Sequence, residues 1–409
     1  MRNSLIVAVF VIATCATRVS AQTTPPPAAG QGQSLQQAIS DQAQRTTLAF
    51  DGLAMITGNL ESQSFFPPGK LADYTGFQFL RDHDSDDMGH NTSFLTRVAN
   101  NVLYILTDAQ VAALRALAAN QVSQINKYGL QRFALMKAFR RLADGTAPAG
   151  ATGLNLSAVK AASQALYLID GQISYDRAVL YADIYRSMDA SQTQYLDAMK
   201  GKGWYSWPDV ADNLVRRKTS GLTNDQVVAV MTYAGDLYSW YAGSVDADVY
   251  FCPERHGTYF GSFYMKDAPA VGHEGYSISQ TVTAEAGGAL CDSGLGYVTD
   301  SQASQFNGLV ETQRNNLYAG TSNIVKARTD IAKALRSLVG TTAPGDEAKA
   351  QVLALVLDRS RTYGELDGEN NYNYATVIAD VDHSLTDSQR ARFQDLRRSI
   401  LAGTYADGT

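Results

Sequence analysis

The sequence predicts an all-α protein with a tandem duplication of a helical bundle, in which each copy carries a long loop rich in aromatic residues and glycine. Three observations lead to this prediction. Apolar residues recur three and four positions apart, as in helices with one buried face. Strand patterns are scarce, apart from a stretch from Tyr259 to Met265 that could be extended. Matching residues recur along the chain at a separation of 185.

The repeat is clearest at two pairs of aromatic residues. Phe66 and Phe251 are 185 positions apart, and so are Tyr74 and Tyr259. The same separation joins Ala49 and Ala234, Asp51 and Asp236, Gly58 and Gly243, Pro68 and Pro253, Gly76 and Gly261, and Asp82 and Asp267. Further along it becomes 197, for Asp170-Gly171 and Asp367-Gly368, Tyr175 and Tyr372, Ser187 and Ser384, and Gln192 and Gln389. A period this long indicates two fused domains rather than a solenoid of short repeats.

Each copy is expected to hold the same series of about five helices. An opening helix, at about 35–57 or 222–242, precedes the aromatic loop region, which extends to His90 or His273. Helices follow whose apolar residues have helical spacing, such as Val111, Leu114, Leu117 and Ala118, or Ile331, Ala334, Leu335 and Leu338. Glycine and proline then interrupt the helical hairpins at 143–154 and 340–345.

Four predicted helices begin with a shared pattern of the form LTxxQ. The starts are Leu106 to Gln110, Leu222 to Gln226, Val298 to Gln302 and Leu385 to Gln389, with Met188 to Gln192 as a looser fifth. The pattern predicts a capping box, in which the threonine hydroxyl accepts a hydrogen bond from the amide three residues on, and the glutamine side chain bonds to the threonine amide.

The same residues resemble the LTxxQ motif of the Spy-like periplasmic proteins, a family of small helical chaperones and metal-stress proteins. The resemblance covers these helix starts only. It implies a helical cradle that binds unfolded client proteins, or a role in the response to metals. A capping box accounts for the same residues without kinship, so the pattern fits both explanations.

The N-terminus has the layout of a secretory signal peptide, with Arg2, an apolar run from Leu5 to Ala13, and small residues up to Ala21. Cleavage there predicts a periplasmic or extracellular protein, and lipid anchoring through Cys15 is the alternative. We predict a signal peptide at 1–21, a Pro/Ala/Gly/Gln linker at 22–34, helical copies at 35–203 and 222–402, an interdomain linker at 204–221 and a tail at 403–409. The mature chain is expected to have no transmembrane segment.

Charge and cysteine content narrow the choice of partners. The formal net charge is -6, so a nucleic acid is not an expected partner. Without Cys15 the chain keeps Cys252 and Cys291, which can form a disulfide in an oxidising compartment, with free thiols as the alternative.

The predicted functional site is the loop from Tyr250 to Gly261 in the second copy. It holds Glu254, Arg255 and His256, side chains that serve in acid–base chemistry and anion binding, and functional residues are frequent in loops. At the matching positions the first copy has Pro67 for Cys252, Gly69 for Glu254 and Leu71 for His256. The residues that both copies share are therefore expected to serve the fold, and those found only in the second copy are the candidates for function.

A metal site is one interpretation of the histidines. Four of the five lie in the two loop regions, at His83, His90, His256 and His273. His256, His273 and Glu254 could together bind zinc or a similar divalent ion, whereas loop histidines without a metal are the alternative.

Two other clusters could form binding sites. The acidic run from Asp82 to Asp87 partly matches a calcium loop, but it lacks the glycine and the closing glutamate of such loops and is more simply a solvated turn. Aromatic residues gather near the end of the second opening helix, where Trp240, Tyr241 and Tyr259 could line a ligand pocket or belong to the core.

Two functions follow from these patterns. The first is an exported binding or scaffold protein of the cell envelope, whose partner is an unknown protein or small-molecule ligand. The second is a secreted, metal-dependent enzyme, with His256 as general acid or base, Glu254 as its partner or as a metal ligand, and Arg255 holding an anion. The sequence does not decide whether the chain is an enzyme, and a divalent metal ion is the one cofactor it suggests.

Overall fold

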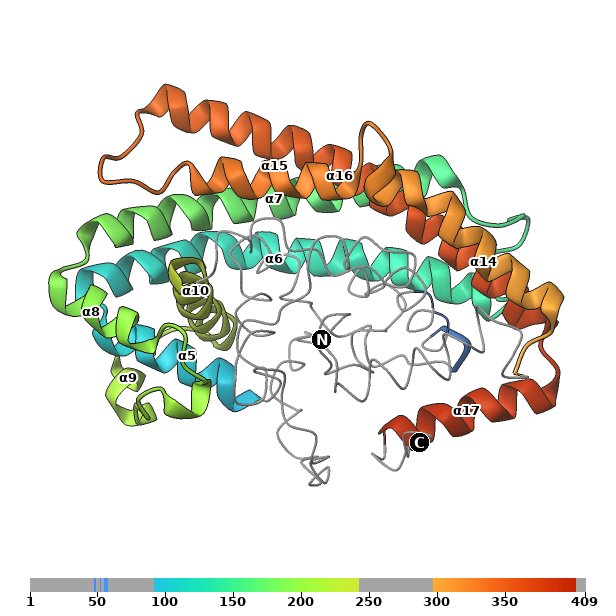
Figure 1. Cartoon of the computed structure of the whole chain (residues 1–409), viewed down its shortest axis with the longest axis horizontal. Coiled ribbons are helices and arrows are strands. Elements are labelled where there is room, and N and C mark those ends of the chain that lie inside the picture. Colours follow the sequence, from blue (N-terminus) through green and yellow to red (C-terminus); the bar gives the residue numbers. More distant parts are fainter. Residues whose placement is uncertain (1–47, 49–51, 53–54, 58–91, 243–296, 402–409) are drawn as a thin grey trace, which may run out of the picture.

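The computed structural model describes residues 48, 52, 55–57, 92–242 and 297–401 (Figure 1). Within these ranges every regular element is a helix, which confirms the predicted all-α class. The first helices are α5 (Thr92–Ile105), α6 (Asp108–Ala143), α7 (Leu156–Ser187), α8 (Ala190–Met199), η3 (Trp204–Ser206), α9 (Asp212–Thr219) and α10 (Asn224–Ala242). The remaining helices are α14 (Asp300–Arg314), η8 (Asn315–Ala319), α15 (Ile324–Arg336), α16 (Asp346–Ser384) and α17 (Asp387–Leu401).

Three long helices form the frame of the molecule. Helices α6, α7 and α16 have 36, 32 and 39 residues, and at 1.5 Å per residue each extends for about 50–60 Å. Figure 1 shows α7 running alongside both α6 and α16, and α15 folding back along α16. Among the described helices, none is both long and apolar enough to cross a lipid bilayer.

The helix boundaries agree with the predicted breaks. Helix α6 ends at Ala143, and Asn155 begins α7 by accepting a hydrogen bond from the amide of Ala158. In the second half, α15 ends at Arg336 and α16 begins after Gly345. The predicted opening helix at 222–242 is also present, as α10.

The segment 204–221, predicted as an interdomain linker, forms η3 and α9. The ring of Trp207 is buried 5.3 Å from the ring of Phe94 on α5, and its Nε1 donates to the carbonyl oxygen of Met199 at 3.0 Å. This segment is therefore packed against α5 and the end of α8.

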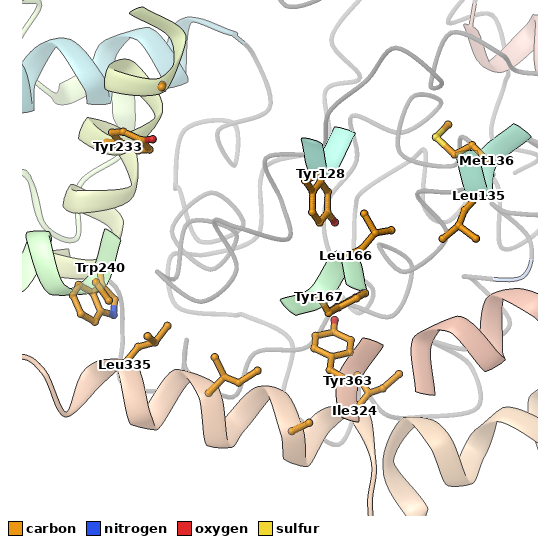
Figure 2. Packing of buried hydrophobic residues seen from close by; sticks show 14 of the residues in the cluster. Tyr128, Leu135, Met136, Leu166, Tyr167, Tyr233, Trp240, Ile324, Leu335 and Tyr363 are labelled. Atoms are coloured by element: carbon orange, nitrogen blue, oxygen red, sulfur yellow. The ribbon is translucent and has the colours of Figure 1, made fainter. Parts of the chain in front are cut away.

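A continuous hydrophobic core connects the two halves (Figure 2). Tyr167 of α7 and Tyr363 of α16 meet with ring centroids 4.4 Å apart. At the end of α10, Trp240 lies beside Leu335 of α15, as Figure 2 shows. Buried aromatic residues thus join helices that are far apart in the sequence.

Candidate functional site

Most of the predicted site residues lie outside the described part of the chain. They are Cys252, Glu254, Arg255, His256, Tyr259, His273 and Cys291. The acidic run from Asp82 to Asp87, the stretch from Tyr259 to Met265 and residues 1–34 lie outside it as well. The catalytic, metal-binding, disulfide and signal-peptide assignments for these residues therefore stay predictions.

Trp240 and Tyr241, which the structure does describe, form the last turn of α10. The Trp240 ring is buried, with centroids 6.2 Å from Tyr181 and 5.9 Å from Tyr185. The Arg336 guanidinium lies 4.8 Å from the Trp240 ring and donates a 2.8 Å hydrogen bond to the Trp240 carbonyl oxygen. A carbonyl in the last turn of a helix has no amide partner within that helix, so Arg336 supplies the missing donor. A role for Trp240 in ligand binding stays a prediction.

Tyr241 fixes the end of α10 against α8. Its hydroxyl donates to Asp197 Oδ1 at 2.9 Å, while Lys200 lies 4.1 Å from its ring and 3.0 Å from the same carboxylate. Burial, and then the hydrogen bond to Asp197, raise the pKa of Tyr241 to about 12. Because Tyr241 keeps its proton at neutral pH, it acts there as a hydrogen-bond donor.

A buried ion pair lies between α7 and α10. Arg177 Nη1 is 2.9 Å from Asp236 Oδ2, and each side chain is 2% exposed. The Arg177 guanidinium also lies 4.6 Å from the ring of Tyr233, whose hydroxyl donates to Gln121 Oε1 at 3.0 Å. Gln121 Nε2 in turn donates to the carbonyl oxygen of Ile173 at 3.1 Å. This network joins α6, α7 and α10.

Burial and the partner's charge act against each other on the pKa of each group in this pair. Burial raises the pKa of Asp236 to about 6, since Arg177 offsets only part of the cost of desolvation. For Arg177 burial is the largest single influence and lowers the pKa, but the attraction to Asp236, Tyr181, Tyr233 and Asp170 taken together outweighs it, so the pKa is raised. Both groups are therefore ionised at neutral pH. A carboxyl with a pKa near 6 is suited to proton transfer, but its burial beside a guanidinium favours a structural role in holding α10.

Two glycine–serine contacts bring α7 and α16 close together. A methyl group at Gly171 would lie under 3.0 Å from Ser360, and one at Gly368 would lie 2.8 Å from Ser163 Cβ. Both glycines belong to the Asp-Gly pairs that match in the sequence, so the structure brings the two matching pairs to one crossing. Beside it, the Tyr167 hydroxyl donates to Asp367 Oδ2 at 2.7 Å.

All four predicted threonine capping boxes are present. Thr107, Thr223, Thr299 and Thr386 each accept from the amide of the glutamine three residues on, and each donates its own amide to that glutamine side chain. At the looser fifth start, Asp189 caps the helix and pairs with Gln192 in the same way. The prediction from the LTxxQ pattern is confirmed.

Four of these glutamines also connect different helices. Gln192 Nε2 donates to Gln110 Oε1 at 2.7 Å, and Gln110 Nε2 donates to Ser187 Oγ at 2.9 Å. In the other half, Gln389 Nε2 donates to Gln302 Oε1 at 3.0 Å, and Gln302 Nε2 donates to Ser384 Oγ at 2.8 Å. The two networks have the same residue types, donors and acceptors.

A half-exposed charge cluster also joins α7 to α16. Lys160 lies 3.1 Å from Glu365 and 2.8 Å from Glu369, and Gln164 donates to Glu365 at 3.0 Å. The hydrogen bond to Glu369 raises the pKa of Lys160, and the same bond lowers the pKa of Glu369. These charges therefore also serve a helix contact.

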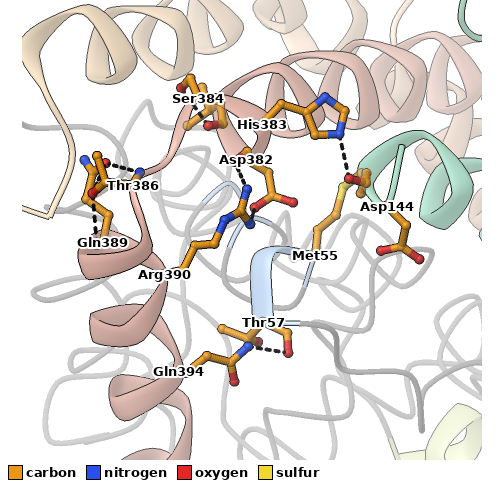
Figure 3. Close-up of polar contacts among 12 residues, drawn as sticks. Met55, Thr57, Asp144, Asp382, His383, Ser384, Thr386, Gln389, Arg390 and Gln394 are labelled. Atoms are coloured by element: carbon orange, nitrogen blue, oxygen red, sulfur yellow. Dashed lines mark hydrogen bonds and ion pairs between the residues drawn. The ribbon is translucent and has the colours of Figure 1, made fainter. Parts of the chain in front are cut away.

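Within the described ranges, no three side chains of the metal-binding types come together. Of the five histidines, His383 is the one that falls in these ranges. Its Nε2 lies 2.7 Å from the carbonyl oxygen of Ala143. Figure 3 shows the His383 ring turned toward the end of α6, beside Asp144. Because a carbonyl can only accept, the ring proton is on Nε2.

The sequence identified Asp236 only as the match of Asp51. Gln192 and Gln389 were identified as matching residues of the predicted helix starts, and Arg177 was missed. The available signal was that Arg177, a charged residue, lies four positions from the apolar Ile173 and four from Tyr181, on one face of α7. Such residues are almost always paired when buried, and Asp236 is the partner.

A scan against protein-family models, a search of the curated proteins and a search of the solved structures find no match to this chain. The structure itself defines an all-α protein whose buried polar contacts join its helices.

Proposed function

We propose that the chain is an exported binding or scaffold protein of the cell envelope, built from two copies of one helical unit. The equivalent glutamine networks support the duplication, because Ser187 and Ser384, like Gln192 and Gln389, are 197 positions apart. The partner is an unknown protein or a small-molecule ligand.

This proposal rests on the charged side chains of the described helices, several of which pair with a side chain of another helix. Arg177 with Asp236, Lys160 with Glu369, and Asp197 with Tyr241 are each used in a contact between helices. Because these charges bind one helix to another, we infer that the helical part of the chain is a rigid scaffold. The residues that distinguish the second copy, Glu254 and His256, are then left to contact a partner.

The resemblance to the Spy-like proteins supports one class of partner, unfolded polypeptide. The test is whether purified mature protein, starting at Gln22, suppresses the aggregation of a reduced, denatured client. Suppression that saturates at a defined ratio of protein to client is the expected result. An aggregation rate unchanged at tenfold excess would remove the client from the proposal, and thermal-shift screens with envelope fragments would then decide whether any ligand remains.

The alternative is a metal-dependent enzyme with its site between residues 250 and 273. The motivating residues are His256, His273 and Glu254, as a ligand set typical of zinc sites. Elemental analysis of the purified protein should then show about one zinc per chain. His256→Ala should lose this zinc, while the matched variant His83→Ala in the first copy should keep it. Protein that binds no metal after incubation with zinc would rule out this function.

A further inference from the structure

The opening helix of the second copy lies on the first copy. Helix α10 packs on α5, α6 and α8. It is joined to α7 through the Arg177–Asp236 pair and through the Tyr185 hydroxyl, which donates to the Leu237 carbonyl oxygen at 2.6 Å. The Tyr241 hydroxyl adds the contact with Asp197 on α8.

The opening segment of the first copy makes the reciprocal contact. Gln394 of α17 donates to the carbonyl oxygen of Thr57 at 3.0 Å (Figure 3). Gln394 and Asp197 are 197 positions apart, and Thr57 is 185 positions from Ala242, the neighbour of Tyr241. Equivalent residues of α8 and α17 therefore contact equivalent turns of the other copy's opening helix.

Each opening helix also keeps an anchor in its own copy. Arg140 donates to the Met55 carbonyl oxygen at 2.6 Å, as Arg336 does to that of Trp240. Met55 and Trp240 are 185 positions apart. The end of each opening helix is thus held between an arginine of its own copy and the last helix of the other.

The ends of the two long central helices show the same exchange. Arg186 of α7 donates to the carbonyl oxygen of Leu338, just after α15, at 3.0 Å. His383 of α16 donates to the carbonyl oxygen of Ala143, at the end of α6. Arg186 and His383 are 197 positions apart. Contacts in which residue i of one unit meets j of the other, and j meets i, are those of an isologous interface.

We propose that the two copies exchange their opening helices, so that α5, α6, α7 and α8 form a docking surface for the opening helix of another copy of the unit. Within this chain α10 occupies that surface, and the second copy offers the equivalent surface to the opening helix of the first. The inference rests on the duplication proposed above. The whole chain is then the single-chain form of a helix-exchanged dimer, in which neither copy completes its core alone.

Two variants of the full chain, each cut by protease after folding, test this proposal. One carries a cleavage site at Gly221, an exposed turn residue with φ +78° between α9 and α10. The other carries the site at 243–244, directly after α10. The first cut makes the contacts between α10 and the first copy intermolecular, whereas the second keeps them within one fragment.

Fragment association is then measured by dilution and size-exclusion chromatography. The pair cut at Gly221 should dissociate at a concentration at least tenfold lower than the pair cut at 243–244. Equal affinities of the two pairs would overturn the proposal. Tighter binding in the pair cut at 243–244 would overturn it as well, because that result is expected if α10 packs only on its own copy. Asp236→Asn should weaken the Gly221-cut pair by tenfold or more and change the other pair by less than twofold. Client or metal binding is measured on the uncut chain, so a failure there does not affect this outcome.

Discussion

A methyl group at Gly364 of α16 would lie 2.8 Å from the carbonyl oxygen of Ser163 on α7. Its other near neighbours are Gln164 Cα and Tyr167 Cβ, both at 2.9 Å. None of these atoms is the end of a flexible side chain, so the two helices would have to separate to make room. Glycine at this position therefore sets the distance between the two helices that join the halves.

Gly364→Ala should consequently destabilise the protein by about 1–3 kcal/mol, as overpacking usually does. The matched control is Gly308→Ala on α14, where an added methyl group meets no atom within 4 Å. Alanine should stabilise that helix by about 0.5–1 kcal/mol. Urea unfolding of both variants measures the difference, and a Gly364→Ala protein as stable as the wild type would contradict the close packing.

The Arg177–Asp236 pair should show strong coupling in a double-mutant cycle. Asp236→Leu alone leaves a buried guanidinium without its carboxylate, at a cost of about 3–5 kcal/mol. Arg177→Met alone leaves the buried carboxylate uncompensated, at a similar cost. The double variant should lose much less than the sum, because two apolar side chains can replace a buried pair. Additive losses would show that the pair does not act as a unit.

The same carboxyl makes the stability depend on pH. The pKa of Asp236 is raised from 3.8 to about 6 in the folded protein, so between these values the folded state binds more protons than the unfolded state. Its contribution is present below about pH 4 and is lost as pH rises to about 6, by roughly 1.4 kcal/mol for each unit of the pKa difference. Asp236→Asn removes this titration. The stability of the wild type relative to Asp236→Asn should therefore fall from pH 4 to pH 6, and a flat difference would refute the raised pKa.

Features that depend on neighbouring residues were predictable from the sequence. The capping boxes at Thr107 and Thr299 need only residues three positions apart, and the break between α6 and α7 needs only a run of glycine and proline. The match of Asp170-Gly171 with Asp367-Gly368 identified important positions, but not the reason for them. The reason is that each glycine packs closely against a serine of the other helix. The spacing of residues along the chain does not show which residues of two helices meet.

The docking of α10 could not be predicted, for a related reason. Hydrophobic periodicity shows that Ala229, Val230, Tyr233 and Leu237 share one face of a helix. It does not show which helices supply the opposing surface. The sequence therefore predicted the helix at 222–242 closely. From the sequence we expected each predicted copy to be a separate bundle.

The capping glutamines differ in their tertiary contacts, and this difference leads to a last prediction. In the described part of the chain, the hydrogen bonds of Gln226 are those of its capping box, at a half-exposed helix start. Gln110 makes the same contacts, and it also donates to Ser187 and accepts from Gln192.

Gln226→Ala should therefore cost about 0.5–1 kcal/mol, as loss of a cap does. Gln110→Ala should cost about 2–3 kcal/mol, because it also leaves buried hydrogen-bonding groups without their partner. Gln302→Ala should behave like Gln110→Ala, since its contacts with Ser384 and Gln389 are equivalent. Equal losses for Gln226→Ala and Gln110→Ala in urea unfolding would mean that these glutamines act as helix caps alone. If Gln302→Ala instead lost only as much stability as Gln226→Ala, that result would count against the equivalence of the two halves.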